Sequence, residues 1–246
     1  MHRFYVNEKQ IHDNLITIIG SDVNHIKNVL RMRCGDELVI CNGQGKDYYC
    51  IINRVSDGEI EAKIDFVKDT GSELQTKITL FQGLPKSDKM ELIIQKAVEL
   101  GVYEVVPVTM ARCVVKNTDK KKEEKKLLRW QAIAESAAKQ SHRGIIPKVR
   151  PIMSFKEAIN YASKMDLSLL PYENEKGMEA TREAIFKLKD CQSAGIIIGP
   201  EGGFEEAEVK LAKDHGIIPI SLGRRILRTE TAALATLSMM ILYLED

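Results

Sequence analysis

The 246-residue sequence predicts an α/β protein with a small β-rich domain followed by a larger domain built on a parallel sheet. Three observations lead to this fold class. Residues 1 to about 70 read as short strands separated by tight turns. From Leu74 onward, apolar strands alternate with amphipathic helices, which is the pattern of a parallel sheet covered by helices. Near the C-terminus, two loops that contain glycine each follow a buried strand, where ligands often bind in such folds.

The first domain, residues 1–70, has the pattern of a small barrel, because regular short strands are joined by tight turns. The turn Asn42–Gly45 supplies the glycines that a positive φ requires. One helix is predicted from about Asp22 to Met32, with Ser21 or Asp22 as its N-cap. Strands are predicted over residues 37–41, 47–55 and 59–67.

The second domain, residues 74–246, is predicted to alternate strands and helices. The helix over residues 86–100 has apolar residues spaced for one buried face, and Gly101 ends it. Strands are predicted over residues 77–82, 103–108, 167–170, 195–198 and 217–220. Helices are predicted over residues 86–100, 119–140, 155–163 and 177–188, from residue 205, and from residue 231 to 244.

The last helix has no charged residue from Ala232 to Leu244, so most of its sides must be covered. It is too short to span a bilayer. We therefore expect it to be buried within its domain, in a homodimer interface, or in both. Thr229 is expected to be its N-cap.

Composition places the chain among ordinary globular proteins, with 44% hydrophobic and 29% charged residues. No apolar run reaches the roughly 18 residues that span a bilayer, and the N-terminus has no apolar signal region. These features predict a cytoplasmic protein without a membrane partner. The five cysteines and five histidines have no paired spacing, so neither a disulfide framework nor a metal site is expected.

Charge is distributed unevenly along the chain although the net charge is only +1. Residues 110–150 contain twelve Lys or Arg and four Asp or Glu, a local charge of +8, so the remaining residues sum to −7. Such asymmetry favours a polyanionic partner. The alternative is a solvated helix face, because Glu123 and Glu124 lie among the lysines at salt-bridge spacing.

The two glycine-containing loops are Gly199–Phe204 and Leu222–Ala232. Neither has the Gly-Lys-Ser/Thr ending of a P-loop, and their glycine spacing is not that of a dinucleotide fingerprint. Each loop alone could be a simple strand-to-helix turn. Together they indicate one site in which backbone approaches a ligand closely.

These two loops resemble the signature of the SPOUT methyltransferases, and more narrowly that of the RsmE family. Enzymes of that family methylate ring nitrogen N3 of a uridine in small-subunit ribosomal RNA. The segment His25–Arg33 resembles the family's N-terminal PUA-like barrel, so the resemblance covers nearly the whole chain. Further similar segments are Gln95–Gly101, Arg129-Trp130, Ala134–Ser136, Gln140-Ser141 and Arg143.

The resemblance implies a homodimer, a C-terminal trefoil knot over about residues 195–246, and S-adenosyl-L-methionine bound in a bent shape among the knot loops. Backbone groups would read the edge of the adenine, and leucines would enclose the ring. The implied cofactor-binding residues are Leu170, Pro171, Tyr172, Gly199, Pro200, Glu201, Gly202, Gly203, Leu222, Gly223, Ile226, Leu227, Arg228, Thr229 and Ala232.

Arg228 and Glu230 are the candidate catalytic residues. The N3 proton of uridine must leave, so either a base removes it or a cation stabilises the anionic ring. Arg228 suits the second task. Glu230 suits the first, with Glu201 as the next carboxylate, but Glu230 could instead orient Arg228 or favour the first turn of the last helix.

RNA phosphates are the expected ligands of a basic helical stretch near the N-terminus. The candidate RNA-binding residues are His25, Lys27, Arg31 and Arg33, with Arg112 and Arg143 as further candidates; a single arginine is more often an ordinary surface residue. The implied partner is 16S rRNA in the small ribosomal subunit, and the basic region 110–150 would help to hold it.

Two other functions remain open at this point. A SPOUT enzyme could act on a ribose 2′-hydroxyl or on tRNA, although the PUA-like resemblance argues against it. The chain could also be a non-catalytic RNA-binding assembly factor, although the intact cofactor loops argue against that function.

Overall fold

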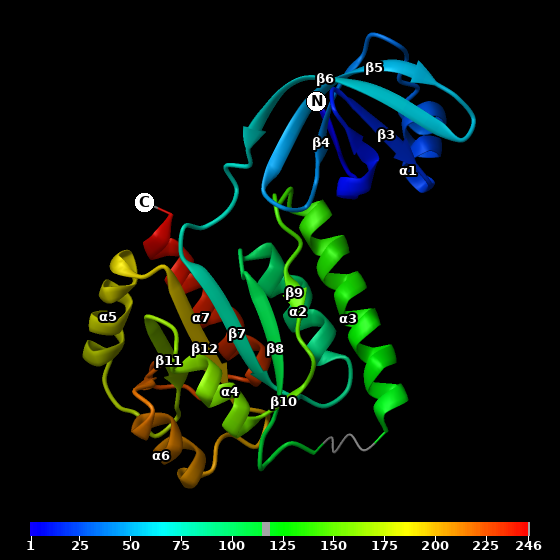
Figure 1. Cartoon of the computed structure of the whole chain (residues 1–246). Helices are drawn as coiled ribbons and strands as arrows, with labels where there is room; N and C mark the ends of the chain where they lie inside the picture. Colours follow the sequence, from blue (N-terminus) through cyan, green and yellow to red (C-terminus); the bar gives the residue numbers. More distant parts are fainter. Residues whose placement is uncertain (115–118, 246) are drawn as a thin grey trace. The chain divides into compact units, whose positions relative to one another are not determined.

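The computed structural model describes residues 1–114 and 119–245, and the chain separates into two compact units (Figure 1). The first unit comprises Met1–Glu73 and Ala138–Ile146. The second comprises Leu74–Ala137 and Pro147–Asp246. Residues 138–146, which the sequence pattern placed in the second domain, thus belong to the first unit. Within the described ranges, no helix has both the length and the hydrophobicity needed to cross a membrane.

The first unit is a six-stranded sheet with the strand order β1-β4-β5-β6-β3-β2. β1 runs parallel to β4, and the other pairs are antiparallel. The three strands expected from the sequence are present, with β5 and β6 slightly longer. The strands are β1 His2–Tyr5, β2 Ile11–His12, β3 Leu15–Ile19, β4 Glu37–Cys41, β5 Lys46–Val55 and β6 Glu59–Asp69.

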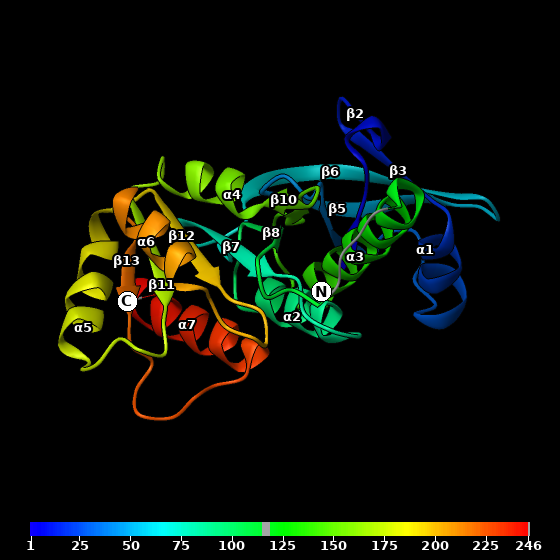
Figure 2. The same cartoon turned by 90° about the horizontal axis from the view of Figure 1, so that it is seen from below.

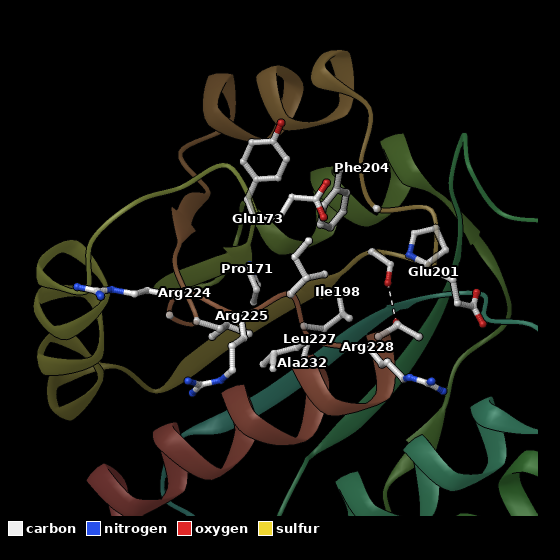
Figure 3. Close-up of a pocket in the computed structure, with 18 of the residues that line it drawn as sticks. Pro171, Glu173, Ile198, Glu201, Phe204, Arg224, Arg225, Leu227, Arg228 and Ala232 are labelled. Carbon is white, nitrogen blue, oxygen red and sulfur yellow. Dashed lines mark hydrogen bonds between the residues drawn. The ribbon is translucent and has the colours of Figure 1, made fainter.

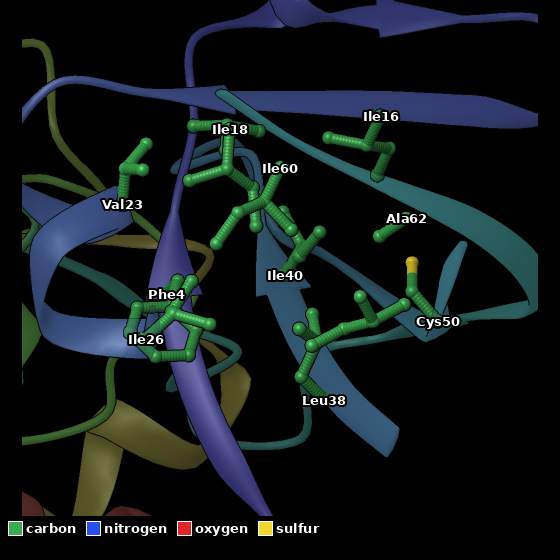
Figure 4. Close-up of a cluster of buried hydrophobic side chains, with 12 residues drawn as sticks. Phe4, Ile16, Ile18, Val23, Ile26, Leu38, Ile40, Cys50, Ile60 and Ala62 are labelled. Carbon is green, nitrogen blue, oxygen red and sulfur yellow. The ribbon is translucent and has the colours of Figure 1, made fainter. Parts of the chain in front are cut away.

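Alternate residues of these strands point into one apolar core (Figure 4). In β3, for example, Ile16 and Ile18 are buried whereas Ile19 is exposed, which is the two-residue period of a sheet with one covered face. Among the described residues, β1 and β2 form the two edges of the sheet and do not pair with each other, so the predicted barrel is open. The labelled core residues are Phe4, Ile16, Ile18, Val23, Ile26, Leu38, Ile40, Cys50, Ile60 and Ala62.

The helix of the first unit differs from the prediction at both ends. It comprises α1, Ser21–Asn24, and a π-helical turn, His25–Val29. The predicted cap is wrong, since Gly20 is the N-cap and no side chain caps the helix. The helix also ends before Met32, because Arg31 has a φ of 55°, outside the right-handed helical region.

The second unit is a seven-stranded sheet in which every pair is parallel, as the sequence predicts. The order is β10-β8-β7-β12-β11-β13, with β9 also paired to β8. β12 therefore lies between β7 and β11, and its apolar run is buried. The strands are β7 Lys77–Gly83, β8 Glu104–Thr109, β9 Lys148–Val149, β10 Met153–Ser154, β11 Leu167–Pro171, β12 Ser193–Ile198 and β13 Ile218–Ile220.

Helices cover both faces of this sheet, with α2 and α7 on one side and α4 and α6 on the other (Figure 2). The second helix begins at Lys89 rather than at residue 86, because Ser87 has a φ of 56°. It ends just before Gly101, as predicted. The helices are α2 Lys89–Glu99, α3 Lys120–Gln140, α4 Phe155–Ala162, α5 Glu179–Phe186, α6 Glu206–Asp214 and α7 Thr229–Leu244.

Candidate functional site

A cavity of about 420 Å³ lies in the second unit, where the chain leaves β11, β12 and β13 (Figure 3). Its volume falls within the usual range for small-molecule sites, about 300–1,000 Å³. Because parallel strands end at one edge of the sheet, three separate loops meet there. The lining residues are Lys89, Pro171, Tyr172, Glu173, Ile198, Gly199, Pro200, Glu201, Gly203, Phe204, Leu222, Gly223, Arg224, Arg225, Ile226, Leu227, Arg228, Thr229 and Ala232.

The loop after β12 is a tight turn held from outside by Arg112. The Gly203 amide donates to the Pro200 carbonyl at 2.9 Å. The Arg112 guanidinium donates to the Gly202 carbonyl at 3.0 Å. A Cβ on Gly202 would lie only 2.9 Å from the Arg112 Cβ, so this position requires glycine.

Thr229 ties this loop to the neighbouring strand and to the last helix. Its hydroxyl donates to the Gly199 carbonyl at 2.6 Å and accepts from Gln82 Nε2 at 2.9 Å. Both Thr229 and Gln82 are buried. Thr229 is the first residue of α7, and the N-cap is the preceding residue, Arg228. The predicted cap role is wrong because the hydroxyl is engaged by Gly199 and Gln82.

Apolar side chains form much of the cavity wall. Pro171, Ile198, Leu227 and Ala232 converge on the middle of the cavity in Figure 3. Such a wall suits a flat, uncharged ring, while the exposed backbone groups of the loops can hydrogen-bond to the edge of that ring.

One end of the cavity carries an ionic cluster of Glu201, Lys89 and Glu230. The Lys89 ammonium lies 3.2 Å from Glu230 Oε2 and 3.4 Å from Glu201 Oε1. The charged contact with Glu230, followed by that with Glu201, raises the pKa of Lys89, although desolvation opposes the shift. Burial favours a higher pKa for Glu201, but hydrogen bonds from its own amide and from the Lys86 amide, together with Lys89, hold its pKa below the ordinary value.

The lip of the cavity is an exposed segment after β13. Arg224 and Arg225 extend away from the middle of the cavity in Figure 3. Ile226, which follows Arg225 in the sequence and precedes Leu227 of the apolar wall, is 84% exposed. An isoleucine this exposed at the edge of a ligand-sized cavity is free to contact a bound molecule.

The cavity brings together all the predicted cofactor-binding residues except Leu170 and Gly202. Leu170 is fully buried inside β11, and Gly202 packs against Arg112. Of the two candidate catalytic residues, Arg228 lines the cavity, whereas Glu230 lies behind it and pairs with Lys89.

Sequence reasoning missed several lining residues. Phe204, Arg224 and Arg225 lie inside the two predicted loops but were not among the implied cofactor-binding residues, and Ile198 directly precedes the first loop. Glu173 follows the predicted Tyr172 in the same way. Lys89 had no such signal, because it comes from the start of α2, far away in the sequence.

The predicted RNA-binding residues near the N-terminus lie on and just after the helix of the first unit. His25, Arg31 and Arg33 are exposed. Lys27 is half-buried and forms an ion pair with Asp57. Their exposure leaves three of these groups accessible to phosphates, and their role in RNA binding stays a prediction.

Arg143 is a structural residue, which contradicts the predicted phosphate contact. Its side chain is only 4% exposed, and Nη2 lies 2.5 Å from Glu73 Oε2 within the first unit. The same Glu73 carboxylate accepts from the Gly144 amide at 2.8 Å. The predicted phosphate role is wrong because this guanidinium is buried against a carboxylate.

Two family models match this chain, an RNA methyltransferase domain over residues 72–241 and an RNA methyltransferase PUA domain over residues 18–65. The chain belongs to the RsmE family of RNA methyltransferases. The resemblance read from the two loops and from the N-terminal segment is thereby confirmed, and the open sheet of the first unit is a PUA-type domain.

Relatives and solved structures agree with this assignment over the full length. The chain is 37% identical over 244 residues to the Bacillus subtilis "Ribosomal RNA small subunit methyltransferase E", covering 97% of this chain and 95% of that one. The Mesomycoplasma hyopneumoniae protein of the same name is 36% identical, covering 98% and 99%.

A solved structure of the Neisseria gonorrhoeae ribosomal RNA small subunit methyltransferase E bound to S-adenosyl methionine is also similar. It has a TM-score of 0.80 and 34% identity, and the alignment covers 98% of this chain and 96% of that one. A Legionella pneumophila putative methyltransferase in complex with the same cofactor also has a TM-score of 0.80 and 34% identity, covering 97% and 96%.

Proposed function

We propose that this protein transfers a methyl group from S-adenosyl-L-methionine to ring nitrogen N3 of a uridine in 16S (small-subunit) ribosomal RNA. The observation that carries the proposal is the cavity of about 420 Å³. Its wall is apolar, the loops that line it can offer backbone hydrogen-bonding groups to a ligand, and Arg228 lies at its edge. The gonococcal relative, which is solved with this cofactor bound, supports the same ligand.

The residues around the cavity fit the proposed cofactor. The wall made by Ile198, Leu222 and Leu227 suits an adenine ring, and the backbone of residues 199–203 and 222–227 can satisfy its polar edge. The carboxylates of Glu173 and Glu201 suit a ligand that carries positive charge. When bound, the cofactor supplies an activated methyl group on a sulfonium, so much of the rate must come from positioning.

Arg228 is the residue that we place against the methyl acceptor. It lines the cavity and is exposed, so its guanidinium can stabilise the negative charge that develops on the uracil ring when the N3 proton leaves. Glu230 is held by Lys89 behind the wall. We assign it to the same reaction centre. Full wild-type turnover in both Arg228→Ala and Glu230→Gln would contradict this placement.

We assign RNA holding to residues 1–70 and methyl transfer to residues 74–246. The exposed Arg31 and Arg33 would contact phosphates, so binding should weaken steeply with salt. Replacing either arginine by methionine should reduce the slope of log affinity against log salt by about one. An unchanged slope would remove that residue from the RNA interface.

We further propose that two copies pair through the C-terminal helix. Leu242 on α7 is 81% exposed, and Phe186 at the end of α5 is 67% exposed and packs edge-on against Tyr243. Such an apolar patch favours a protein partner, and here a second copy of this chain. Light scattering should give a dimer mass for the native protein and a monomer mass for Leu242→Glu.

We also propose that residues 195–246 are threaded as a trefoil knot. The bond from Thr229 to the Gly199 carbonyl, which brings the start of α7 onto the loop after β12, supports this path. Pulling the chain from both ends in optical tweezers should then give a final length shorter than that of the fully extended chain. A full extended length would exclude the knot.

The decisive experiment is labelled-methyl transfer to small ribosomal subunits from a strain that lacks the modification, followed by nucleoside mass analysis. N3-methyluridine is expected. We also propose that the protein works in the cytoplasm, where its ribosomal substrate is found. Methyl on a ribose or only on tRNA would indicate another enzyme of the superfamily. Absence of both transfer and calorimetric heat with the cofactor would indicate a non-catalytic assembly factor.

A further inference from the structure

Among the described residues, Lys89 is the one cation of the cavity that forms ion pairs with two carboxylates from separate parts of the second unit. It is the first residue of α2, and its side chain is 30% exposed. Glu201 belongs to the loop after β12, and Glu230 to the first turn of α7. A single ammonium thus contacts both the loop after β12 and the first turn of α7.

Glu230 depends on this ammonium more than Glu201 does. Glu230 Oε2 is buried and makes no hydrogen bond of good geometry in the described part of the chain, so the Lys89 ammonium at 3.2 Å compensates its charge. Glu201 has a second partner, because the Lys86 amide donates to its Oε1 at 3.0 Å. Without Lys89, the Glu230 carboxylate would have to turn away from its buried position.

We infer that Lys89 is a positioning residue of the methyl-transfer site, which fixes the Glu230 carboxylate in the first turn of α7, directly after Arg228. This role rests on the function proposed above. Because misplacing a reaction centre by about 1 Å can lower a rate by about 100-fold, loss of this contact should act mainly on the catalytic step.

Three variants test the role. Lys89→Met keeps the length of the side chain but removes its charge, and kcat for rRNA methylation should fall about 10- to 100-fold. Lys89→Arg keeps a cation and should recover kcat to within about threefold of wild type. The matched control is Lys86→Met, whose exposed side chain is lost but whose backbone amide still donates to Glu201. Its kcat should stay unchanged.

Two further readouts separate positioning from a general structural effect. The calorimetric Kd for S-adenosyl-L-methionine should change less than about threefold in Lys89→Met, so that kcat and cofactor affinity separate. The double variant Lys89→Met/Glu230→Gln should be no slower than the slower single variant, because both act through one contact. A wild-type kcat in Lys89→Met, no recovery in Lys89→Arg, or multiplying effects in the double variant would overturn the inference.

Failure of the two proposals can be told apart. A wild-type protein that transfers no methyl group to small subunits refutes the proposed function and this role with it. A wild-type protein that is active, with Lys89→Met equally active, refutes only the role of Lys89.

Discussion

Replacing Thr229 by valine removes one hydroxyl from the junction between β7, the loop after β12 and α7, and changes little else. Valine has nearly the same shape as threonine, and the site is 5% exposed, so neither new space nor new water contact is created. The Gly199 carbonyl loses its 2.6 Å donor, and Gln82 Nε2 loses its 2.9 Å acceptor. The variant therefore isolates the contribution of the hydroxyl.

The expected loss of stability follows from those two contacts. A buried polar group left without a partner costs about 1–3 kcal/mol. Most of this loss of stability should come from the Gly199 carbonyl, because Gln82 Nε2 keeps its hydrogen bond to the Gly83 carbonyl at 2.9 Å. Gln82 Oε1 is already buried and has no hydrogen-bond partner among the described residues, so the other end of the amide offers no compensating bond. We expect Thr229→Val to lower the free energy of unfolding by about 2–3 kcal/mol.

Tryptophan fluorescence during urea unfolding measures this loss in the correct part of the protein. Trp130 is the only tryptophan in the chain, is buried, and belongs to the second unit. The control is Thr229→Ser, which keeps the hydroxyl and should lose only about 0.8 kcal/mol for the missing methyl group. Equal losses in Thr229→Val and Thr229→Ser would refute the reasoning, since the hydroxyl would then contribute nothing.

Three further predictions follow from single contacts. Gly83→Ala should weaken S-adenosyl-L-methionine binding at least about tenfold in calorimetry, because the new Cβ would lie 2.8 Å from Pro200 N and displace the loop. Arg143→Met should lower the free energy of unfolding by about 3 kcal/mol in urea denaturation, because it removes the cation that pairs with Glu73 and leaves that carboxylate only its backbone amide donors. Burial raises the pKa of Cys50 to about 12, while the unfolded thiol ionises near pH 8.5, so the urea midpoint should fall as pH rises from about 8.5 towards 12, and fall less in Cys50→Ala.

Most of the second unit could be predicted from its sequence because its strands are buried on both faces. Runs such as Gly195–Ile198 read as strands without any tertiary information, and helices with one apolar face separate them. β9 and β10 escaped prediction because two residues carry no pattern. The order of the strands could not be predicted either, because periodicity shows which face of the sheet a residue occupies but not which strand lies beside its own.

The parts of the candidate site that come from one stretch of sequence could be predicted. The contacts that depend on the strand order could not. Glycines in two loops after buried strands pointed to the cavity. Lys89 reaches Glu230 only because the starts of α2 and α7 come together on one side of the sheet. Arg143 looked like a surface cation because Glu73, its partner, lies 70 residues earlier in the chain.

The place of β12 between β7 and β11 bears on how the protein is made. Both flanking strands leave the ribosome before β12 does, so each waits with an unpaired edge that can associate wrongly with another chain. Residues 222–232, which complete the cavity, emerge later still. A nascent chain therefore has no place for a ligand until nearly all of it has been synthesised, and ligand capture would report that synthesis and folding are finished.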